Sequence, residues 1–237
     1  MQTMTEREKI ITENYHSVMY KIEEARRRRG TGEEVTLLAA TKTVPAEEIV
    51  FAAEELGLRV AGENRAQEFT AKYDAVSPHL DYQFIGSLQR NKVKYVVGRA
   101  SLIHSVSSLS LAEEISARAE RLGITQDILI EINIAAEESK SGFLPGEAAA
   151  AIEHIRALPA VNLRGMMTMG AAEAEKDAVK KYFQESYAIF IDNFIKKSHN
   201  IRESILSMGM SDSFESAIEE GATLVRVGSA IFGHRNP

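Results

Sequence analysis

The sequence predicts an α/β fold, a single (β/α)8 TIM barrel with an additional N-terminal helix. From residue 35 onward, eight short apolar segments of strand character alternate with helical segments. Strands joined by crossover helices must be parallel, and a parallel sheet needs both faces covered or closure into a barrel. A doubly wound open sheet is the alternative, but eight units at an even spacing of about 24 residues favour the barrel.

The first element is a long helix. Thr5 and Glu8 have the spacing of a capping box, and Gly30 and Gly32 end the helix. Between these signals, apolar side chains recur on one helical face, at Ile11, Tyr15, Val18, Met19 and Ile22. We expect this helix, within residues 1–34, to pack on the outside of the barrel or to cover its floor. No linker or repeat divides the chain, so residues 1–237 are expected to form one domain, with the barrel in residues 35–237.

The barrel elements follow from apolar runs and from helix start and stop signals. Pro45 and Gly57 bound one helix, Ser108 or Ser110 begins another that Gly123 closes, and Pro145 begins a third. A fourth helix is expected to begin at Ser211 or Asp212 and to end at Gly221. The expected strands are Val35–Thr41, Leu58–Glu63, Tyr82–Gly86, Leu102–Val106, Ile128–Asn133, Leu163–Met169, Ile205–Met208 and Leu224–Gly228.

Composition narrows the function classes. The chain has no cysteine, which excludes disulfides, thiolate catalysis and zinc–thiolate sites. Its formal net charge of −6 offers no electrostatic footprint for nucleic acid or for an anionic membrane. No apolar run approaches the roughly 18 residues of a membrane span, and the N-terminus lacks the apolar core of a signal peptide. The six histidines show no metal-ligand spacing. We therefore expect a cytoplasmic monomer that binds no nucleic acid, membrane or metal.

A lysine follows the first predicted strand, at the barrel end where active sites lie. Lys42 comes directly after the apolar stretch Leu37–Thr41, where a charged ammonium is costly to bury. A lysine in such surroundings readily loses its proton and can form a Schiff base with an aldehyde. The alternative is a lysine that lies along the barrel rim with its amine in water.

Turns rich in glycine and serine follow strands seven and eight, where barrels frequently hold the phosphate of a ligand. Gly209 and Gly228 would let the backbone approach an anion, while Ser207, Ser211 and Ser229 offer hydroxyl and amide groups. The alternative is that these residues only form turns and helix caps.

Arg226 lies on strand eight and shares one face with Leu224, so alternation directs it into the barrel and directs Val225 and Val227 toward the helices. A buried arginine needs an acceptor, which Glu63 or a ring nitrogen of a ligand could supply. A lysine for an aldehyde, a phosphate cradle and an arginine between them describe a pyridoxal 5′-phosphate (PLP) site. Arginine beside the pyridine nitrogen would leave that nitrogen unprotonated, which suits racemisation or simple binding better than decarboxylation or transamination.

Motifs along the whole chain carry a family resemblance. They are residues 37–43 (LLAATKT), 62–64 (GEN), 84–92 (FIGSLQRNK), 103–106 (IHSV), 139–142 (SKSG), 163–167 (LRGMM), 206–212 (LSMGMSD) and 225–233 (VRVGSAIFG). The sequence resembles the pyridoxal phosphate homeostasis protein family, whose fold is that of the N-terminal barrel of alanine racemase. The last two motifs are the most specific.

The resemblance implies a set of cofactor-binding residues, which are Lys42, Asn64, Ser207, Met208, Arg226, Gly228 and Ser229. Lys42 would be the Schiff-base lysine, Asn64 would lie beside the cofactor, and Arg226 would face the pyridine nitrogen. The residues after strands seven and eight would hold the phosphate. Gln83 and Glu131 depart from the family pattern, and we expect both to neighbour the site only loosely.

Three functions compete. The first is a PLP-binding protein without an established reaction, which takes part in intracellular vitamin B6 homeostasis and buffers PLP or delivers it to apoenzymes. Alanine racemases add a β-rich domain and a tyrosine acid/base, and we expect no such domain to follow the barrel here. The second is a small PLP-dependent amino-acid racemase, with His104, Tyr73, Tyr82 or Tyr95 as the acid/base. The third is an aldolase that uses Lys42 without a cofactor, which would leave the two phosphate turns unexplained.

Overall fold

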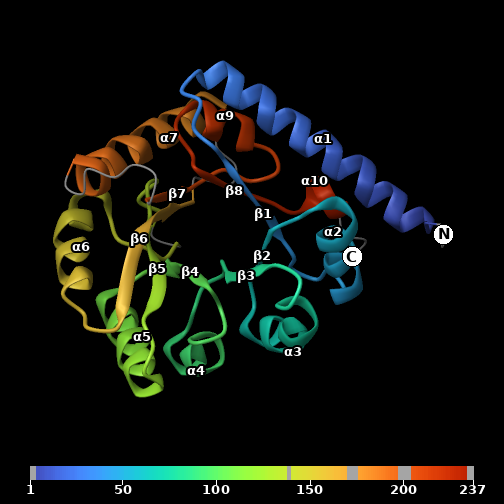
Figure 1. Ribbon diagram of the computed structural model, residues 1–237. Coiled ribbons are helices and arrows are strands. Elements are labelled where there is room, and N and C mark those ends of the chain that lie inside the picture. The colour runs from blue at the N-terminus through green and yellow to red at the C-terminus, as the bar shows by residue number, and fades with distance from the viewer. Residues whose placement is uncertain (1–3, 138–139, 170–175, 197–203, 234–237) are drawn as a thin grey trace.

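Eight strands form a closed parallel barrel in the computed structural model, which describes residues 4–137, 140–169, 176–196 and 204–233 (Figure 1). Each strand pairs in parallel with the next, and the last pairs in parallel with the first. The predicted TIM barrel is therefore confirmed. The strands are β1 (Thr36–Ala40), β2 (Val60–Glu63), β3 (Asp81–Phe84), β4 (Leu102–Val106), β5 (Gln126–Ile132), β6 (Val161–Thr168), β7 (Ile205–Ser207) and β8 (Leu224–Val227).

Helices surround the strands as an outer layer (Figure 1). Pro45 and Gly57 bound the helix after β1, and Ser108 caps the helix after β4, as the sequence predicts. Among the helices within the described ranges, none combines the length and the apolar character that a membrane crossing requires. The helices are α1 (Glu6–Arg29), α2 (Ala46–Leu56), α3 (Ala66–Val76), η1 (Arg90–Lys92), α4 (Val93–Val96), α5 (Leu109–Leu122), η2 (Pro145–Glu147), α6 (Ala148–Arg156), α7 (Lys176–Phe190), η3 (Ile191–Ile195), α9 (Phe214–Glu219) and α10 (Ser229–Phe232).

The N-terminal helix α1 begins with the predicted capping box. The Thr5 hydroxyl accepts a hydrogen bond from the Glu8 N–H (3.2 Å), and the Glu8 carboxylate accepts one from the Thr5 N–H (2.6 Å). The helix ends at Gly30, whose φ of 73° lies in the left-handed region that glycine adopts without strain. It packs along the outside of the barrel against α9 and α10 (Figure 1), which decides between the two predicted positions. Its buried face consists of Ile11, Tyr15, Val18, Ile22 and Ala25.

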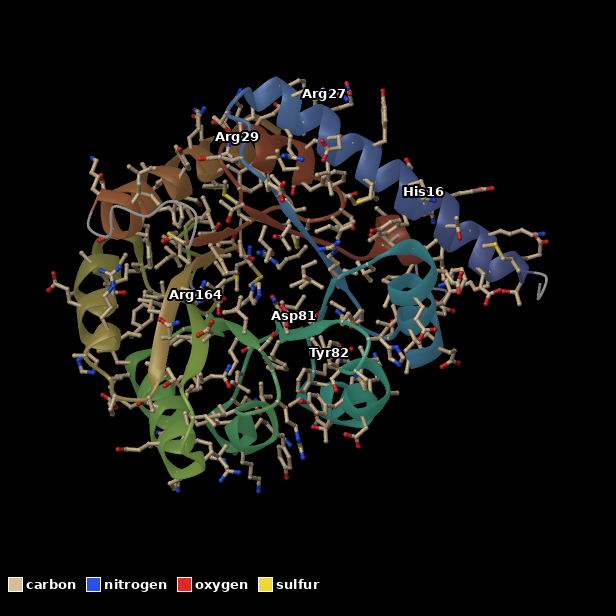
Figure 2. All side chains as sticks on the ribbon, viewed as in Figure 1. His16, Arg27, Arg29, Asp81, Tyr82 and Arg164 are labelled. Carbon is tan, nitrogen blue, oxygen red and sulfur yellow. The ribbon has the colours of Figure 1, made fainter. Side chains whose placement is uncertain are left out.

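Side chains fill the interior of the barrel, so it is a packed core rather than a channel (Figure 2). Leu38 and Leu224 pack together inside the barrel, whereas Val225 and Val227 belong to the apolar layer between strands and helices. Burying a leucine in this way contributes about 1.5–3 kcal/mol. The alternation predicted for strand eight is therefore confirmed, and it directs Arg226, which is only 6% exposed, into the barrel.

The segment between β7 and β8 differs from the prediction. Helix α9 begins after Ser213, not at Ser211 or Asp212, and it ends at Glu219 rather than at Gly221. Ser211 does not cap this helix because its hydroxyl accepts hydrogen bonds from backbone N–H groups at the end of β8 instead. The start of the helix is therefore decided by a contact between distant segments.

Candidate functional site

A cavity of about 1000 Å³ lies at the C-terminal ends of the strands, the barrel end where functional sites are built. Its wall brings together residues that follow β1, β2, β7 and β8. Five of the seven expected cofactor-binding residues line it, namely Lys42, Asn64, Arg226, Gly228 and Ser229. Ser207 and Met208 do not line it.

Lys42 stands in a tight turn directly after β1. The Val44 N–H donates to the Thr41 carbonyl (2.9 Å) and closes this turn. Thr43, inside the turn, has a φ of 65°, a left-handed conformation that is an outlier for a β-branched residue. Lys42 itself is half-buried and lines the cavity. The strand-one lysine is therefore available to a ligand in the cavity rather than spread over the outer wall.

A group of backbone donors follows β8. The N–H groups of Gly228 and Ala230 both donate to the Ser211 hydroxyl oxygen, at 3.2 and 3.3 Å. A Cβ on Gly228 would lie 3.0 Å from the Ala40 carbonyl oxygen, so glycine allows this turn to approach the end of β1 closely. These two bonds fix the Ser211 oxygen on the cavity wall, so the hydroxyl protons of Ser211 and Ser229 can be donated to an anionic oxygen, and thus to a phosphate group. Ser211 and Ser229, not Ser207, are the serines of this set that line the cavity.

Ser207 lies inside the barrel, where its hydroxyl binds Arg226. Arg226 donates from Nη1 to the Ser207 hydroxyl (2.7 Å) and from Nη2 to the Thr168 carbonyl (3.1 Å). Glu63, one of the two acceptors that the sequence offered for Arg226, instead accepts from Lys72 (2.7 Å), so that alternative is wrong. Burial lowers the pKa of Arg226 to about 10, while the charge of the Glu131 carboxylate opposes this shift. The guanidinium therefore stays charged at neutral pH.

The hydrogen bonds behind Arg226 form a chain with a single direction. The Asp81 carboxylate can only accept, so Gln83 donates its side-chain N–H to it (2.8 Å) and turns its carbonyl oxygen toward His104. His104 then donates from Nε2 to that oxygen (2.7 Å), which leaves Nδ1 to accept from the Ser207 hydroxyl (3.1 Å). The Ser207 oxygen in turn accepts from Arg226.

The charge state of His104 agrees with this chain. Complete burial, together with the Arg226 charge, holds the pKa of His104 well below its ordinary value. The neutral ring therefore has one donor and one acceptor, as the chain requires. Gln83 does not neighbour the site only loosely, as expected from the sequence, because it holds the histidine that holds Ser207.

Glu131 on β5 also lies closer to the site than expected. It is 2% exposed, its Oε1 accepts from the Ser141 hydroxyl (3.2 Å), and its Oε2 has no hydrogen-bond partner among the described residues. Burial raises the pKa of Glu131, while Ser141 and the Arg226 charge oppose the shift. Within the same loop motif, Lys140 binds Glu137 (3.0 Å), and Ser139 lies outside the described residues.

Several residues weighed from the sequence lie off the cavity. The Met208 side chain is buried in the apolar layer between strands and helices. His104 is enclosed in the barrel, and Tyr73, Tyr82 and Tyr95 are not among the described residues that line the cavity. Within the described part of the chain, none of the four acid–base candidates of the racemase hypothesis therefore reaches the cavity wall.

Comparisons with known proteins agree with this architecture. The family model described as the alanine racemase N-terminal domain matches residues 14–236. The pyridoxal phosphate homeostasis protein of Aquifex aeolicus is 42% identical over 225 residues, which cover 94% of this chain and 97% of that protein. This chain belongs to the pyridoxal phosphate homeostasis protein family.

Other members of the pyridoxal phosphate homeostasis protein family and related structures extend the comparison. The Escherichia coli protein of this name is 35% identical over 231 residues, 95% of this chain and 97% of its own length. PipY of Synechococcus elongatus, solved with PLP bound, aligns with a TM-score of 0.79 at 29% identity, over 94% of this chain and 100% of PipY. Alanine racemase of Clostridium difficile, 18% identical, aligns with a TM-score of 0.69 over 95% of this chain and 57% of its own, which shows the fold alone.

Proposed function

We propose that this protein binds pyridoxal 5′-phosphate in the cavity at the strand ends, as a Schiff base on Lys42. The observation that carries the proposal is the meeting on one cavity wall of a lysine after β1 and the serines Ser211 and Ser229 after β7 and β8, whose hydroxyls are compatible with a phosphate. The names of the homeostasis relatives and the PLP-bound PipY structure support the choice of cofactor. When bound, PLP supplies an aldehyde carbon attached to an electron-withdrawing ring.

Each residue on the wall has a separate task in this proposal. Lys42 offers its amine to the aldehyde carbon. Gly228 and Ser229, with the Ser211 hydroxyl, hold the phosphate, and Asn64 lies beside the ring. Arg226 faces the ring nitrogen, and because it keeps its proton it leaves that nitrogen unprotonated. Ser207 acts from behind, through its 2.7 Å hydrogen bond from Arg226, rather than by touching the phosphate with its hydroxyl.

We propose that the protein holds PLP within vitamin B6 homeostasis, buffering it or delivering it to apoenzymes, and that it catalyses no reaction of its own. The position of the acid–base candidates off the cavity wall, within the described residues, favours binding over racemisation. That the protein is a cytoplasmic monomer, and that residues 1–237 form one PLP-binding domain, stay predictions of the same proposal.

Reduction with borohydride followed by peptide mass spectrometry tests the proposal. The purified protein incubated with PLP should absorb in the violet, and reduction should leave a phosphopyridoxyl group on Lys42. The Lys42→Ala variant should lose both signals. Lys21→Ala, which removes an exposed lysine of α1, is the matched control and should keep them. An adduct spread over surface lysines, or absorbance unchanged in Lys42→Ala, would refute the assignment.

A further inference from the structure

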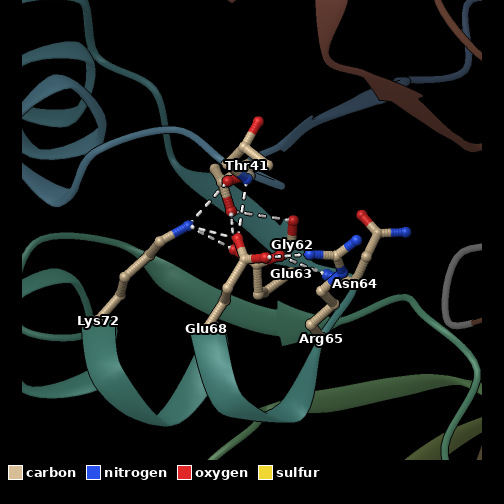
Figure 3. Close-up of polar contacts among 8 residues, drawn as sticks. Thr41, Gly62, Glu63, Asn64, Arg65, Glu68 and Lys72 are labelled. Atoms are coloured by element: carbon tan, nitrogen blue, oxygen red, sulfur yellow. Dashed lines mark hydrogen bonds and ion pairs between the residues drawn. The ribbon is translucent and has the colours of Figure 1, made fainter. Parts of the chain in front are cut away.

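Three charged side chains form a compact group behind the Lys42 turn, which we name the Lys72 cluster: Lys72, Glu63 and Glu68 (Figure 3). The Lys72 ammonium contacts the Glu63 carboxylate at 2.7 Å and the Glu68 carboxylate at 3.3 Å. The Glu63 side chain is completely buried and the Lys72 side chain is 13% exposed. A buried charge such as that of Glu63 is costly unless it is paired and hydrogen-bonded, and the cluster has further hydrogen-bond partners.

Two of those partners are the residues that flank Lys42, of which Figure 3 labels Thr41. Lys72 donates to the Thr41 carbonyl (3.0 Å). The Thr41 hydroxyl shares its one proton between the Gly62 carbonyl (3.1 Å) and the Glu63 carboxylate (3.3 Å). On the other side, the Thr43 N–H donates to Glu68 (2.8 Å). The cluster therefore forms hydrogen bonds to the backbone both before and after the lysine, and we call these contacts the grip on the turn. Among the described residues, no hydrogen bond joins the cluster to the lysine itself.

Thr43 is the residue for which this grip matters most. Its φ of 65° is unfavourable for any residue with a Cβ, and more so for a β-branched one. Left to its own preference, the turn would relax toward negative φ at this position. The Glu68 carboxylate, which receives the Thr43 N–H in this conformation, opposes that relaxation.

The cluster also reaches the second wall of the cavity. The Glu63 oxygen that does not bind Lys72 accepts a hydrogen bond from the Asn64 N–H (2.7 Å). One buried carboxylate is thus linked to the turn after β1 and to the turn after β2, and both turns present residues that line the cavity. Arg65 contacts the other oxygen of Glu68 (3.3 Å). Burial opposes the ionisation of Glu68, but the Thr43 N–H, Lys72 and Arg65 outweigh it and hold the pKa of this carboxyl below its usual value.

We infer that the Lys72 cluster presets the Lys42 turn for reaction with an aldehyde, so that Lys72 and Glu68 are positioning residues for the Schiff-base lysine. This inference rests on the proposed function. It predicts that the turn is ordered before any ligand arrives. Without the grip, only a fraction of molecules would hold Lys42 in the reactive arrangement, and the apparent affinity would fall by that fraction.

The test compares Glu68→Ala with Glu68→Gln. Alanine removes the acceptor for the Thr43 N–H while favouring the helix, and glutamine keeps an acceptor at the same place. We expect Glu68→Ala to weaken PLP binding and to slow the growth of the violet absorbance by about tenfold, as for a turn that is correctly formed a tenth of the time. Glu68→Gln should recover most of the loss. Glu114→Ala on α5, another partly buried glutamate beside arginines, is the matched control and should leave both unchanged.

A second variant separates positioning from general stability. Glycine adopts φ near +65° without cost, so Thr43→Gly should restore most of the binding that Glu68→Ala loses. In the ligand-free protein, Glu68→Ala should also speed amide hydrogen exchange at Thr43 and Val44 by about tenfold, and Glu114→Ala should not. Lys72→Met should act in the same direction as Glu68→Ala.

The outcomes are distinguishable from failure of the proposed function. If the unmodified protein forms no adduct on Lys42, the proposed function fails, yet the exchange measurement still tests the preset turn. If the unmodified protein binds PLP and Glu68→Ala binds it equally well and equally fast, the inference is overturned. It is also overturned if Glu68→Ala loses binding but Thr43→Gly restores none of it, because the loss would then not pass through the turn.

Discussion

Replacing Ser207 by alanine should destabilise the protein far more than replacing Ser105. Both serines are buried, at 0% and 1% exposure, and both lie on barrel strands. The Ser207 hydroxyl joins Arg226 to His104. The Ser105 hydroxyl has no hydrogen-bond partner among the described residues. The same chemical change is thus made at two buried sites that differ in whether the hydroxyl is used.

The magnitude follows from the groups left without partners. Ser207→Ala leaves one Arg226 N–H and the Nδ1 atom of His104 unpaired inside the barrel. A hydrogen bond to a charged group contributes about 1.5–3 kcal/mol, and an unsatisfied buried acceptor costs about 1–3 kcal/mol. Taking the lower part of both ranges, because neighbours relax, the free energy of unfolding should fall by about 3 kcal/mol. Ser105→Ala removes a hydroxyl that makes no bond, so its free energy of unfolding should stay within about 0.5 kcal/mol or rise.

Urea unfolding followed by circular dichroism measures both variants beside the unmodified protein. Thermal unfolding followed by the same signal gives a second measure. For a chain of this length, each kcal/mol shifts the melting temperature by about 2–4 °C, so Ser207→Ala should melt about 6–12 °C lower. The urea midpoint should fall without a change in slope. Equal midpoints for Ser207→Ala and Ser105→Ala would show that the directional chain through Ser207 contributes nothing, and the reasoning would have to be given up.

Three further predictions follow from the same contacts. Because burial depresses the pKa of His104, only the unfolded chain takes up this proton below about pH 6.5, so stability should fall as the pH drops from there. His104→Gln should show a smaller fall in the urea midpoint over that range. Gly86→Ala places a Cβ 1.9 Å from the Asn64 carbonyl and should cost about 3 kcal/mol and weaken PLP binding, whereas Gly146→Ala, with nothing within 4 Å, should be neutral in both assays. Ile11→Ala, at 0% exposure on α1, should cost about 3 kcal/mol in urea unfolding.

The barrel could be predicted from the sequence because short, largely buried segments with an apolar centre alternate with helices that carry clear start and stop signals. The boundaries of the strands were harder to predict from the sequence, and β5 illustrates the reason. Gln126 begins this strand, two residues before the predicted start, although a glutamine is a poor candidate for a buried strand. It is buried because its amide donates to the Ala100 carbonyl (2.9 Å) and accepts from the Gly98 N–H (3.0 Å). These hydrogen-bond partners come from another part of the chain, so the local sequence around Gln126 does not predict them.

The site was predictable to the extent that barrel topology and the family motifs decide it. Closing the sheet brings the ends of β1, β2 and β8 to one place, and the residues expected there from the motifs, Lys42, Asn64, Arg226, Gly228 and Ser229, do line one cavity. The charged groups behind that wall could not be predicted in this way. Lys72 lies on an outer helix, where a lysine is ordinarily solvated. Only the fold shows that it contacts a buried glutamate, Glu63.

The difference between Ser207 and Ser211 is instructive because alternation already separates them. Ile205 packs inside the barrel, so a period of two directs Ser207, the last residue of β7, to the same interior face. Alternation likewise directs Arg226 inward, and β7 pairs with β8, so the serine and the arginine must meet inside the barrel. Ser211 follows the strand beyond a left-handed glycine, Gly209, where alternation no longer holds and the chain turns toward the cavity. The serine at the strand end therefore binds a neighbouring side chain, whereas the one past the turn lies on the cavity wall, where its hydroxyl proton can be donated to a ligand.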